Sequence, residues 1–360
     1  VQLTNVADGF TIWSESYNRS LDKIFEMQEE IATSVAGSLG VRLGVGDVNA
    51  FHGAGTQNVD AYEAYLQALS KNWSASSTKE AIVLLERAIE LDPDYAVAWS
   101  LLAVKILSTS SDVQLDETPE VVERAHELAL RGVQLNPESA TAHSILAIVG
   151  WTQYDWVGSE QGHRRAIELL KDRPTVDRYG VLLMRTGRTA EAQKQFDLAM
   201  ELEPLGGRPP NMSWHTPLMQ GRIAEAKEII ATWHDKINTT ENNLDVAFNE
   251  QDPEALKAAI RALPTVDDDY LRLPYLHLYS PVLAEFDSPE RVLSILRAVY
   301  RDESLQWPRK NHDIAMLAVY FGDPEFALKV KGEEVRLSTA RLHAVWYPFM
   351  SEVRRLPEFK

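Results

Sequence analysis

The feature that most constrains the fold of this chain is an amphipathic helical pattern that recurs and ends each time at a proline. Helical spacing resumes after each proline, so the proline separates two helices rather than ending the helical region. Pro137 and Pro204 lie 67 residues apart, close to two units of about 34, and Pro93 and Pro137 lie 44 residues apart. The interval between Pro93 and Pro137 is longer than one unit, and its extra residues fall in a polar stretch, Ser108–Glu120, which we expect to be an inserted loop. The copies are Ala88–Trp99 (AIELDPDYAVAW), Gly132–His143 (GVQLNPESATAH) and Ala199–Leu205 (AMELEPL), with prolines Pro93, Pro137 and Pro204.

A period near 34 residues with two helices per unit is the pattern of tetratricopeptide repeats (TPR). Small residues at fixed positions let two antiparallel helices approach closely, and one large residue fills the gap that they leave. A proline then ends the second helix. The clearest unit is Arg173–Gly206, which places Gly180, Ala192, Phe196, Ala199 and Pro204 at these positions.

The pattern predicts a mainly α fold, an α-solenoid of TPR-like helix pairs. We expect the array to cover residues 59–337 with about seven or eight helix pairs, clearest within 62–206. Beyond Pro204 the prediction rests on helical spacing and on Asp-Pro or Ser-Pro helix starts at Asp252, Ser288 and Asp323. A terminal repeat leaves an apolar face open, so residues 338–360 are predicted to form a capping helix.

The first 58 residues have a different pattern. Alternating apolar residues at Phe10 and Ile12, after a turn at Ala7–Gly9, predict a short β-hairpin. Ser20–Asp22 then leads into an amphipathic helix with Ile24, Phe25, Gln28, Ile31, Val35 and Leu39 on one face. We therefore divide this region into a small domain at 1–43 and a glycine-rich linker at 44–58.

The charge balance excludes several classes of partner. Lys and Arg number 36 and Asp and Glu number 53, which gives a net charge of −17. A nucleic-acid-binding protein normally carries a basic face, so we expect no nucleic acid and no contact with an anionic membrane. The chain has no cysteine, which rules out disulfides and thiolate metal sites.

Two stretches resemble bacterial signalling proteins in which a TolB-like domain precedes a TPR array. Gly9–Val35 resembles the end of the TolB-like domain, although Asn18 stands where Asp is usual, and Asp155–Leu169 resembles a motif of the third repeat. The closing VRRLPEFK is similar to the C-terminal ending of these proteins. The matching residues in the first stretch are Trp13, Glu15, Tyr17, Arg19, Phe25, Gln28 and Ile31.

The resemblance implies that residues 1–43 are the remnant of a TolB-like α/β domain and that the chain is the regulatory half of a longer protein. In such proteins the effector is a class III nucleotide cyclase, a winged-helix regulator or a kinase. The chain begins at Val1, within a predicted strand, which also leads us to expect a fragment. We expect a cytoplasmic location, or a periplasmic one if a membrane segment lies upstream.

No residues in the sequence form a recognisable catalytic, cofactor-binding or metal-binding motif. The nine histidines lack metal-ligand spacing, and His143 and His163 are predicted to be core residues. His312–Asp313 resembles half of a catalytic triad, but no serine stands in a nucleophile-elbow context, so a helix-start pair is favoured. The glycines at 44–55 lack a following Gly-Lys-Ser/Thr, which favours a linker over a phosphate loop.

The remaining candidate site is the concave groove that first helices line in a TPR array. An apolar groove flanked by arginines suits an extended or helical peptide with an acidic edge. The sequence is equally compatible with these side chains packing between helices. The candidate residues are Leu101, Val104, Ser144, Ile145, Ile148, Trp151, Asp177, Arg178, Val181 and Arg185.

We therefore predict a non-catalytic scaffold or sensor module that binds a protein, a peptide or its own upstream effector domain. A second hypothesis is a homodimer scaffold that pairs through the exposed edge of the N-terminal hairpin. An enzyme without a recognisable motif ranks third.

Overall fold

The structure is a computed structural model in which two compact units are distinguished. Unit 1 comprises Val1–Asp112 and Pro119–Val149, and unit 2 comprises Val113–Thr118 and Gly150–Lys360. The residues that the structure describes are 1–4, 10–18, 23–38, 55–71, 75–107, 119–203, 212–232, 236–263, 274–305, 307, 309–337 and 341–359.

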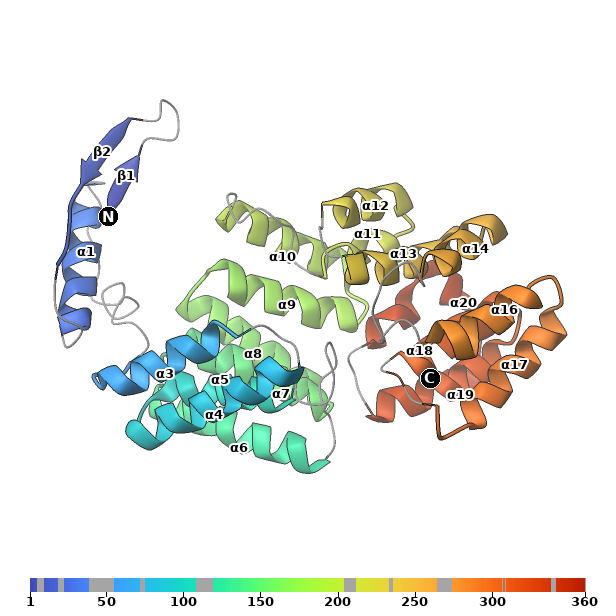
Figure 1. Cartoon of the computed structure of the whole chain (residues 1–360), viewed down its shortest axis with the longest axis horizontal. Coiled ribbons are helices and arrows are strands. Elements are labelled where there is room, and N and C mark those ends of the chain that lie inside the picture. The colour runs from blue at the N-terminus through green and yellow to red at the C-terminus, as the bar shows by residue number, and fades with distance from the viewer. Residues whose placement is uncertain are drawn as a thin grey trace. The chain divides into compact units, whose positions relative to one another are not determined.

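Helices that follow one another in pairs make up most of the described chain, which confirms the predicted α-solenoid class (Figure 1). Among the described residues between 59 and 337, the helices form eight such pairs. The inserted loop predicted within Ser108–Glu120 lies outside the described residues up to Thr118. The pairs are α3 (Val59–Leu69) with α4 (Ala75–Leu91), α5 (Ala96–Leu107) with α6 (Pro119–Leu135), α7 (Ala140–Thr152) with α8 (Trp156–Leu169), α9 (Arg173–Arg185) with α10 (Thr189–Leu202), α11 (His215–Met219) with α12 (Ile223–Ala231), α13 (Lys236–Glu250) with α14 (Pro253–Ala262), η3 (Tyr275–Tyr279) and α16 (Ser280–Ala284) with α17 (Pro289–Arg301), and α18 (Lys310–Tyr320) with α19 (Pro324–Leu337).

The N-terminal hairpin is present in unit 1. Strands β1 (Gln2–Thr4) and β2 (Thr11–Ser14) pair antiparallel, with Leu3 opposite Trp13. The following helix, α1 (Ile24–Ser38), packs on α3 through the rings of Phe25 and Tyr62, whose centroids are 5.3 Å apart. The predicted turn at residues 7–9, the helix start at 20–22 and Leu39 lie outside the described residues.

The last residues of the predicted linker belong to the first helix pair. Asn58 caps α3, because its Oδ1 accepts from the amide of Ala61 at 3.1 Å and its Nδ2 donates to the carbonyl of Leu91 at 2.9 Å. Such a cap stabilises a helix by about 1 kcal/mol. Residues 39–54 of this region lie outside the described residues.

The repeat positions found in the sequence do pack two helices closely. A Cβ added to Gly180 on α9 would lie 2.7 Å from the ring of Phe196 on α10. Ala192 and Ala199, the other two small positions, are fully buried. The small and large residues are therefore complementary across one helix pair, as the spacing predicts.

The first helices α9 and α11 are each followed by a glycine in the left-handed conformation. Gly187 after α9 has a φ of 77°, and Gly221 after α11 has a φ of 75°. The amide of Arg188 then donates to the carbonyl of Leu183 at 2.9 Å, which closes the end of α9. Gly187 and Gly221 thus form the same type of turn after a helix, and both positions require a positive φ.

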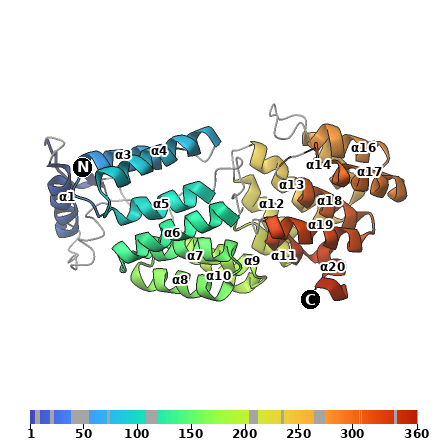
Figure 2. The same cartoon turned by 90° about the horizontal axis from the view of Figure 1, so that it is seen from below.

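The chain after α19 is not the single capping helix predicted for residues 338–360. The described part consists of η4 (Leu342–Trp346), η5 (Pro348–Met350), α20 (Ser351–Arg355) and η6 (Pro357–Phe359). Pro348 and Pro357 interrupt it, because proline lacks the amide hydrogen that a continuing helix needs. Figure 2 shows α20 beside α19, and within unit 2 the turns η4 and η5 before it contact α9, α13 and α18. We call residues 342–359 the C-terminal segment.

Candidate functional site

The ten residues predicted to line a peptide groove differ in exposure. The first five in chain order lie in unit 1 and the other five in unit 2. Ile145 shares the buried face of α7 with Ala142 and Val149, so its side chain contributes to the core. Leu101, Val104, Ile148, Asp177, Arg178 and Val181 are partly exposed, whereas Ser144, Ile145, Trp151 and Arg185 are buried.

In unit 2 the partly exposed candidates form one patch on α9. Val181 lies four residues after Asp177 and three after Arg178, so its side chain neighbours both of these consecutive residues on the helix surface. We call these three residues the α9 patch. It combines a carboxyl group, a guanidinium group and an apolar side chain on a first helix of the array.

The carboxyl group of the α9 patch is in an unusual environment. Burial raises the pKa of Asp177 to about 6, although Arg173 and Arg178 favour its ionised form. Its Oδ1 is buried and has no hydrogen-bond partner among the described residues. Buried polar atoms are normally paired, so the carboxylate form of Asp177 lacks a hydrogen bond that would stabilise it at this oxygen.

Arg185 has a different role from the one predicted. Its guanidinium carbon lies 4.5 Å from the ring centroid of Trp151, in a cation–π contact, and its side chain is buried. Its backbone carbonyl accepts a hydrogen bond from the indole Nε1 of Trp346 at 2.9 Å. Arg185 therefore anchors α9 to the core and to the C-terminal segment.

Aromatic rings from α7, α8 and α9 pack against one another. The ring of His163 on α8 lies 5.9 Å from the ring of Trp151 and 6.1 Å from that of Tyr179. Burial, with a smaller effect from Arg178, lowers the pKa of His163 to about 3, so the ring is neutral. His163 is a core residue, as predicted. His143 is instead partly exposed, and its Nε2 pairs with the carbonyl of Pro137 at 2.9 Å.

A carboxylate on α8 fixes the neighbouring helices. Glu160 accepts from Arg164 and Arg188, each at 2.8 Å, and from the hydroxyl of Tyr179 at 2.9 Å. The two arginines lower the pKa of Glu160 to about 2. This ion-paired cluster sets the position of α9 against α8 and α10.

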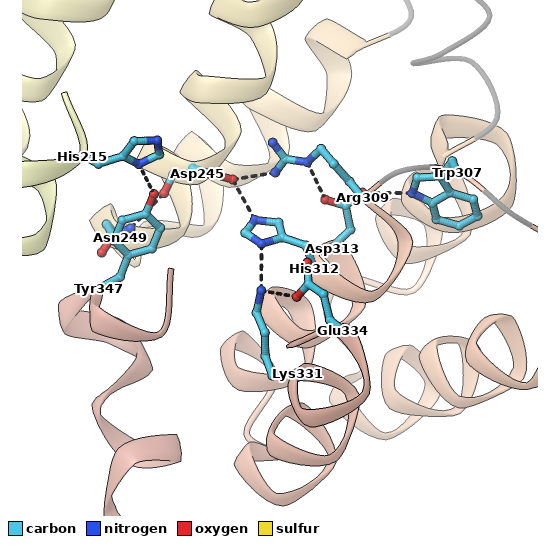
Figure 3. Close-up of polar contacts among 10 residues, drawn as sticks. All are labelled: His215, Asp245, Asn249, Trp307, Arg309, His312, Asp313, Lys331, Glu334 and Tyr347. Atoms are coloured by element: carbon cyan, nitrogen blue, oxygen red, sulfur yellow. Dashed lines mark hydrogen bonds and ion pairs between the residues drawn. The ribbon is translucent and has the colours of Figure 1, made fainter. Parts of the chain in front are cut away.

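A second polar cluster lies buried further along unit 2 (Figure 3). Arg309, just before α18, donates through Nη2 to Asp245 on α13 at 2.6 Å and through Nε to Asp313 on α18 at 3.1 Å. The indole of Trp307 donates to the other oxygen of Asp313 at 3.1 Å. One guanidinium group therefore bridges two buried carboxyl groups.

His312 extends this cluster to α19. Its Nδ1 lies 3.0 Å from Nζ of Lys331, and its Nε2 lies 3.3 Å from Oδ1 of Asp245. Burial and the nearby Lys331 hold the pKa of His312 well below its usual value. The ammonium group can only donate, so Nδ1 accepts and Nε2 carries the proton towards Asp245. Lys331 also pairs with Glu334 (Figure 3).

The cluster fits a structural clamp better than a catalytic centre. Asp245, Arg309, His312, Asp313 and Lys331 are all buried, and within the described part of the chain the hydrogen bonds of His312 go to Asp245 and Lys331. Among the described residues, no three acidic or histidine side chains are placed to hold a metal ion. Sequence reasoning found only the His312–Asp313 pair, because Asp245 and Lys331 lie far away in the chain and have no spacing that marks them.

Comparison with known proteins relates part of the chain to a signalling protein. No model of a known protein family matches. A stretch of 149 residues, 41% of the chain, is 26% identical to a protein described as putative adenylate cyclase 3 of Rhizobium meliloti strain 1021. The match covers 25% of that protein, so the chain spans about a quarter of the length of this relative.

Solved structures share the fold. Human IFIT1, solved as a dimer with PPP-AAAA, superposes with a TM-score of 0.53 at 12% identity, over 92% of this chain and 78% of that one. A tetratricopeptide repeat protein of Parabacteroides merdae gives a TM-score of 0.47 at 13% identity, over 73% and 98% of the two chains. The fold is a TPR-like α-solenoid. Within the described part of the chain, no helix combines the length and apolarity needed to cross a bilayer.

Proposed function

We propose that this chain is a non-catalytic module of a bacterial signalling protein and that it binds a peptide or protein through the α9 patch. The observation that carries the proposal is the partly exposed face of Asp177, Arg178 and Val181 on a first helix of a TPR-like array. A guanidinium group beside an apolar side chain suits an extended or helical peptide with acidic and apolar residues.

The signalling role rests on two similarities. One is the match to a putative adenylate cyclase, and the other is the resemblance of residues 9–35 to the end of a TolB-like domain. The partner is then a separate peptide, or the effector domain of the same protein, and the module acts in the cytoplasm. Catalysis would belong to parts of the longer protein outside this chain.

A display selection tests the binding site. A random dodecapeptide library on phage is selected against the immobilised full chain, and the enriched peptides are synthesised and titrated. We expect acidic residues in the enriched peptides, and affinity for Arg178→Glu reduced by about tenfold or more, because a charge-assisted contact contributes roughly 1.5–3 kcal/mol.

Arg261→Glu provides the matched control. Arg261 is exposed on α14 of the same unit, so the variant changes the net charge equally. We expect it to leave the affinity unchanged. Arg185→Glu is unsuitable for this test, because Arg185 is buried against Trp151. The proposal fails if no peptide is enriched, or if the enriched peptides bind Arg178→Glu as tightly as wild type.

A further inference from the structure

The C-terminal segment reaches α9 close to the α9 patch. The indole of Trp346 donates to the carbonyl of Arg185 and lies against Gly187, where an added Cβ would be 2.8 Å from two ring carbons. Only a residue without a side chain permits this approach at position 187. The end of α9 at Arg185 and the following Gly187 therefore form the packing site of one aromatic ring, which we call the seat of Trp346.

The same segment continues across two more first helices of unit 2. The hydroxyl of Tyr347 lies 2.6 Å from Nδ1 of His215 on α11. The ring of Phe349 stacks on Phe248 of α13, with centroids 5.9 Å apart and an interplanar angle of 11°. Tyr347 is fully buried. Three consecutive first helices thus contact one short stretch of chain, which is how a TPR array holds a peptide.

Contacts within the segment hold its shape. Arg354 donates through Nη1 to the carbonyl of Tyr347 at 2.9 Å and also to that of Val345. The rings of Trp346 and Phe359 meet edge to face, 6.3 Å apart. A segment whose internal contacts already hold the bound conformation loses less conformational entropy on docking than a flexible segment does.

The α9 patch and the seat of Trp346 are close enough for one peptide to cover both. Asp177 and Arg185 are eight residues apart on the helix, which corresponds to about 12 Å. An extended peptide covers that distance with about four residues. A peptide of this length that runs along α9 from the patch reaches the end of the helix at which Trp346 is bound.

We propose that the C-terminal segment is a built-in ligand of unit 2, and that the partner of the α9 patch carries an aromatic side chain that takes the place of Trp346. This inference rests on the proposed function for the identity of the site. It adds the chemistry of the partner, an acidic peptide with an aromatic residue about four positions from its acidic edge, and a competition in which the segment blocks access.

Competition by a tethered segment has a measurable consequence. A tethered ligand acts at an effective concentration on the order of millimolar, so micromolar free peptide does not displace it. A fluorescein-labelled peptide of residues 341–359 should not bind the wild-type full chain. It should bind the Trp346→Ala full chain at least about tenfold more tightly than wild type, a difference of ~1.4 kcal/mol. The same peptide with Trp346→Ala should bind neither.

Two glycine variants test the seat without removing an aromatic side chain. Gly187→Ala and Gly221→Ala impose the same left-handed strain, but only the first meets Trp346, since nothing lies within 4 Å of a Cβ at Gly221. Hydrogen exchange of amides 342–350 should accelerate by about tenfold or more in Gly187→Ala relative to Gly221→Ala. If Trp346→Ala does not fold, the exchange rates of the two glycine variants test the inference on their own.

The outcomes separate this inference from the proposed function. Binding of the 341–359 peptide to Trp346→Ala, without any peptide enriched by display, would support the built-in ligand and contradict the proposed function. Suppose instead that the enriched peptides bind the α9 patch, contain no aromatic residue and do not accelerate hydrogen exchange of amides 342–350. That result would support the proposed function and contradict the built-in ligand. Equal exchange in the two glycine variants, or equal peptide binding by folded Trp346→Ala and wild type, overturns the inference.

Discussion

The backbone carbonyl of Arg185 and the indole of Trp346 are joined by a hydrogen bond of 2.9 Å across 161 residues of sequence. The hydroxyl of Tyr154 makes a second such link, to the carbonyl of Val335 at 2.6 Å. In a simple repeat array each unit contacts only its neighbours, and stability is nearly the sum of local contributions. These links tie the start of unit 2 to its end, so we expect unit 2 to unfold more cooperatively than such an array.

The buried arginine of the charge cluster should be essential for stability. Arg309→Met leaves Asp245 and Asp313 buried without their cation, and removing one partner of a buried pair costs about 3–5 kcal/mol. Denaturant unfolding of the variant measures the loss. The control is Arg291→Met, whose exposed pair with Glu285 is worth no more than about 1 kcal/mol. Equal losses in the two variants would show that the buried cluster contributes no more than a surface ion pair.

Asp177→Asn should stabilise the protein at neutral pH. The folded-state pKa of Asp177, about 6, lies above its usual 3.8, so the folded protein holds the proton more tightly and loses stability as pH rises through this range. The amide removes that loss, which should give a gain on the order of 1–2 kcal/mol at pH 7.5 and none near pH 4. Asp287→Asn, at an exposed position, should show no comparable gain. A less stable Asp177→Asn at pH 7.5 would mean that the carboxylate is paired in the folded protein.

His163→Phe should make the protein more resistant to acid. Burial lowers the pKa of His163 from 6.5 to about 3, so the unfolded chain binds its proton first and stability falls as pH drops from 6.5 towards 3. Phenylalanine does not titrate, and Phe196 occupies the equivalent position of the next pair. At pH 5 the gain over wild type should be about 2 kcal/mol greater than at pH 7.5. Parallel curves of stability against pH would contradict this assignment.

Local pattern was sufficient to predict the helix pairs. Gly180, Phe196 and Pro204 each act within one unit, so their spacing alone indicates two helices in close contact. The pairing of the two N-terminal strands was predictable for the same reason, since β1 and β2 are close together in sequence.

The candidate site was predictable only in part. Asp177, Arg178 and Val181 are partly exposed on α9, and their role in binding stays a prediction, whereas Ile145 and Arg185 are buried. A shift of one residue on a helix turns a side chain by about 100°, and spacing alone does not resolve such a shift.

Contacts between distant segments could not be predicted from the sequence. Asp245 and Arg309 are 64 residues apart, and each resembles an ordinary surface charge in its own helix. Pro348 and Pro357 mark the breaks in the C-terminal segment, but nothing near them indicates that Trp346 packs against Gly187. Such pairs emerge only when the array brings its helices together.

The most direct test of this account follows the indole NMR signal of Trp346 while an enriched display peptide is titrated into the full chain. The signal is assigned by its loss in Trp346→Phe. We predict that it shifts as the peptide saturates wild type, and that Arg178→Glu requires about tenfold more peptide for the same shift. A peptide that binds with the Trp346 signal unchanged, and equally well to Arg178→Glu, would contradict both the α9 site and its competition with the C-terminal segment.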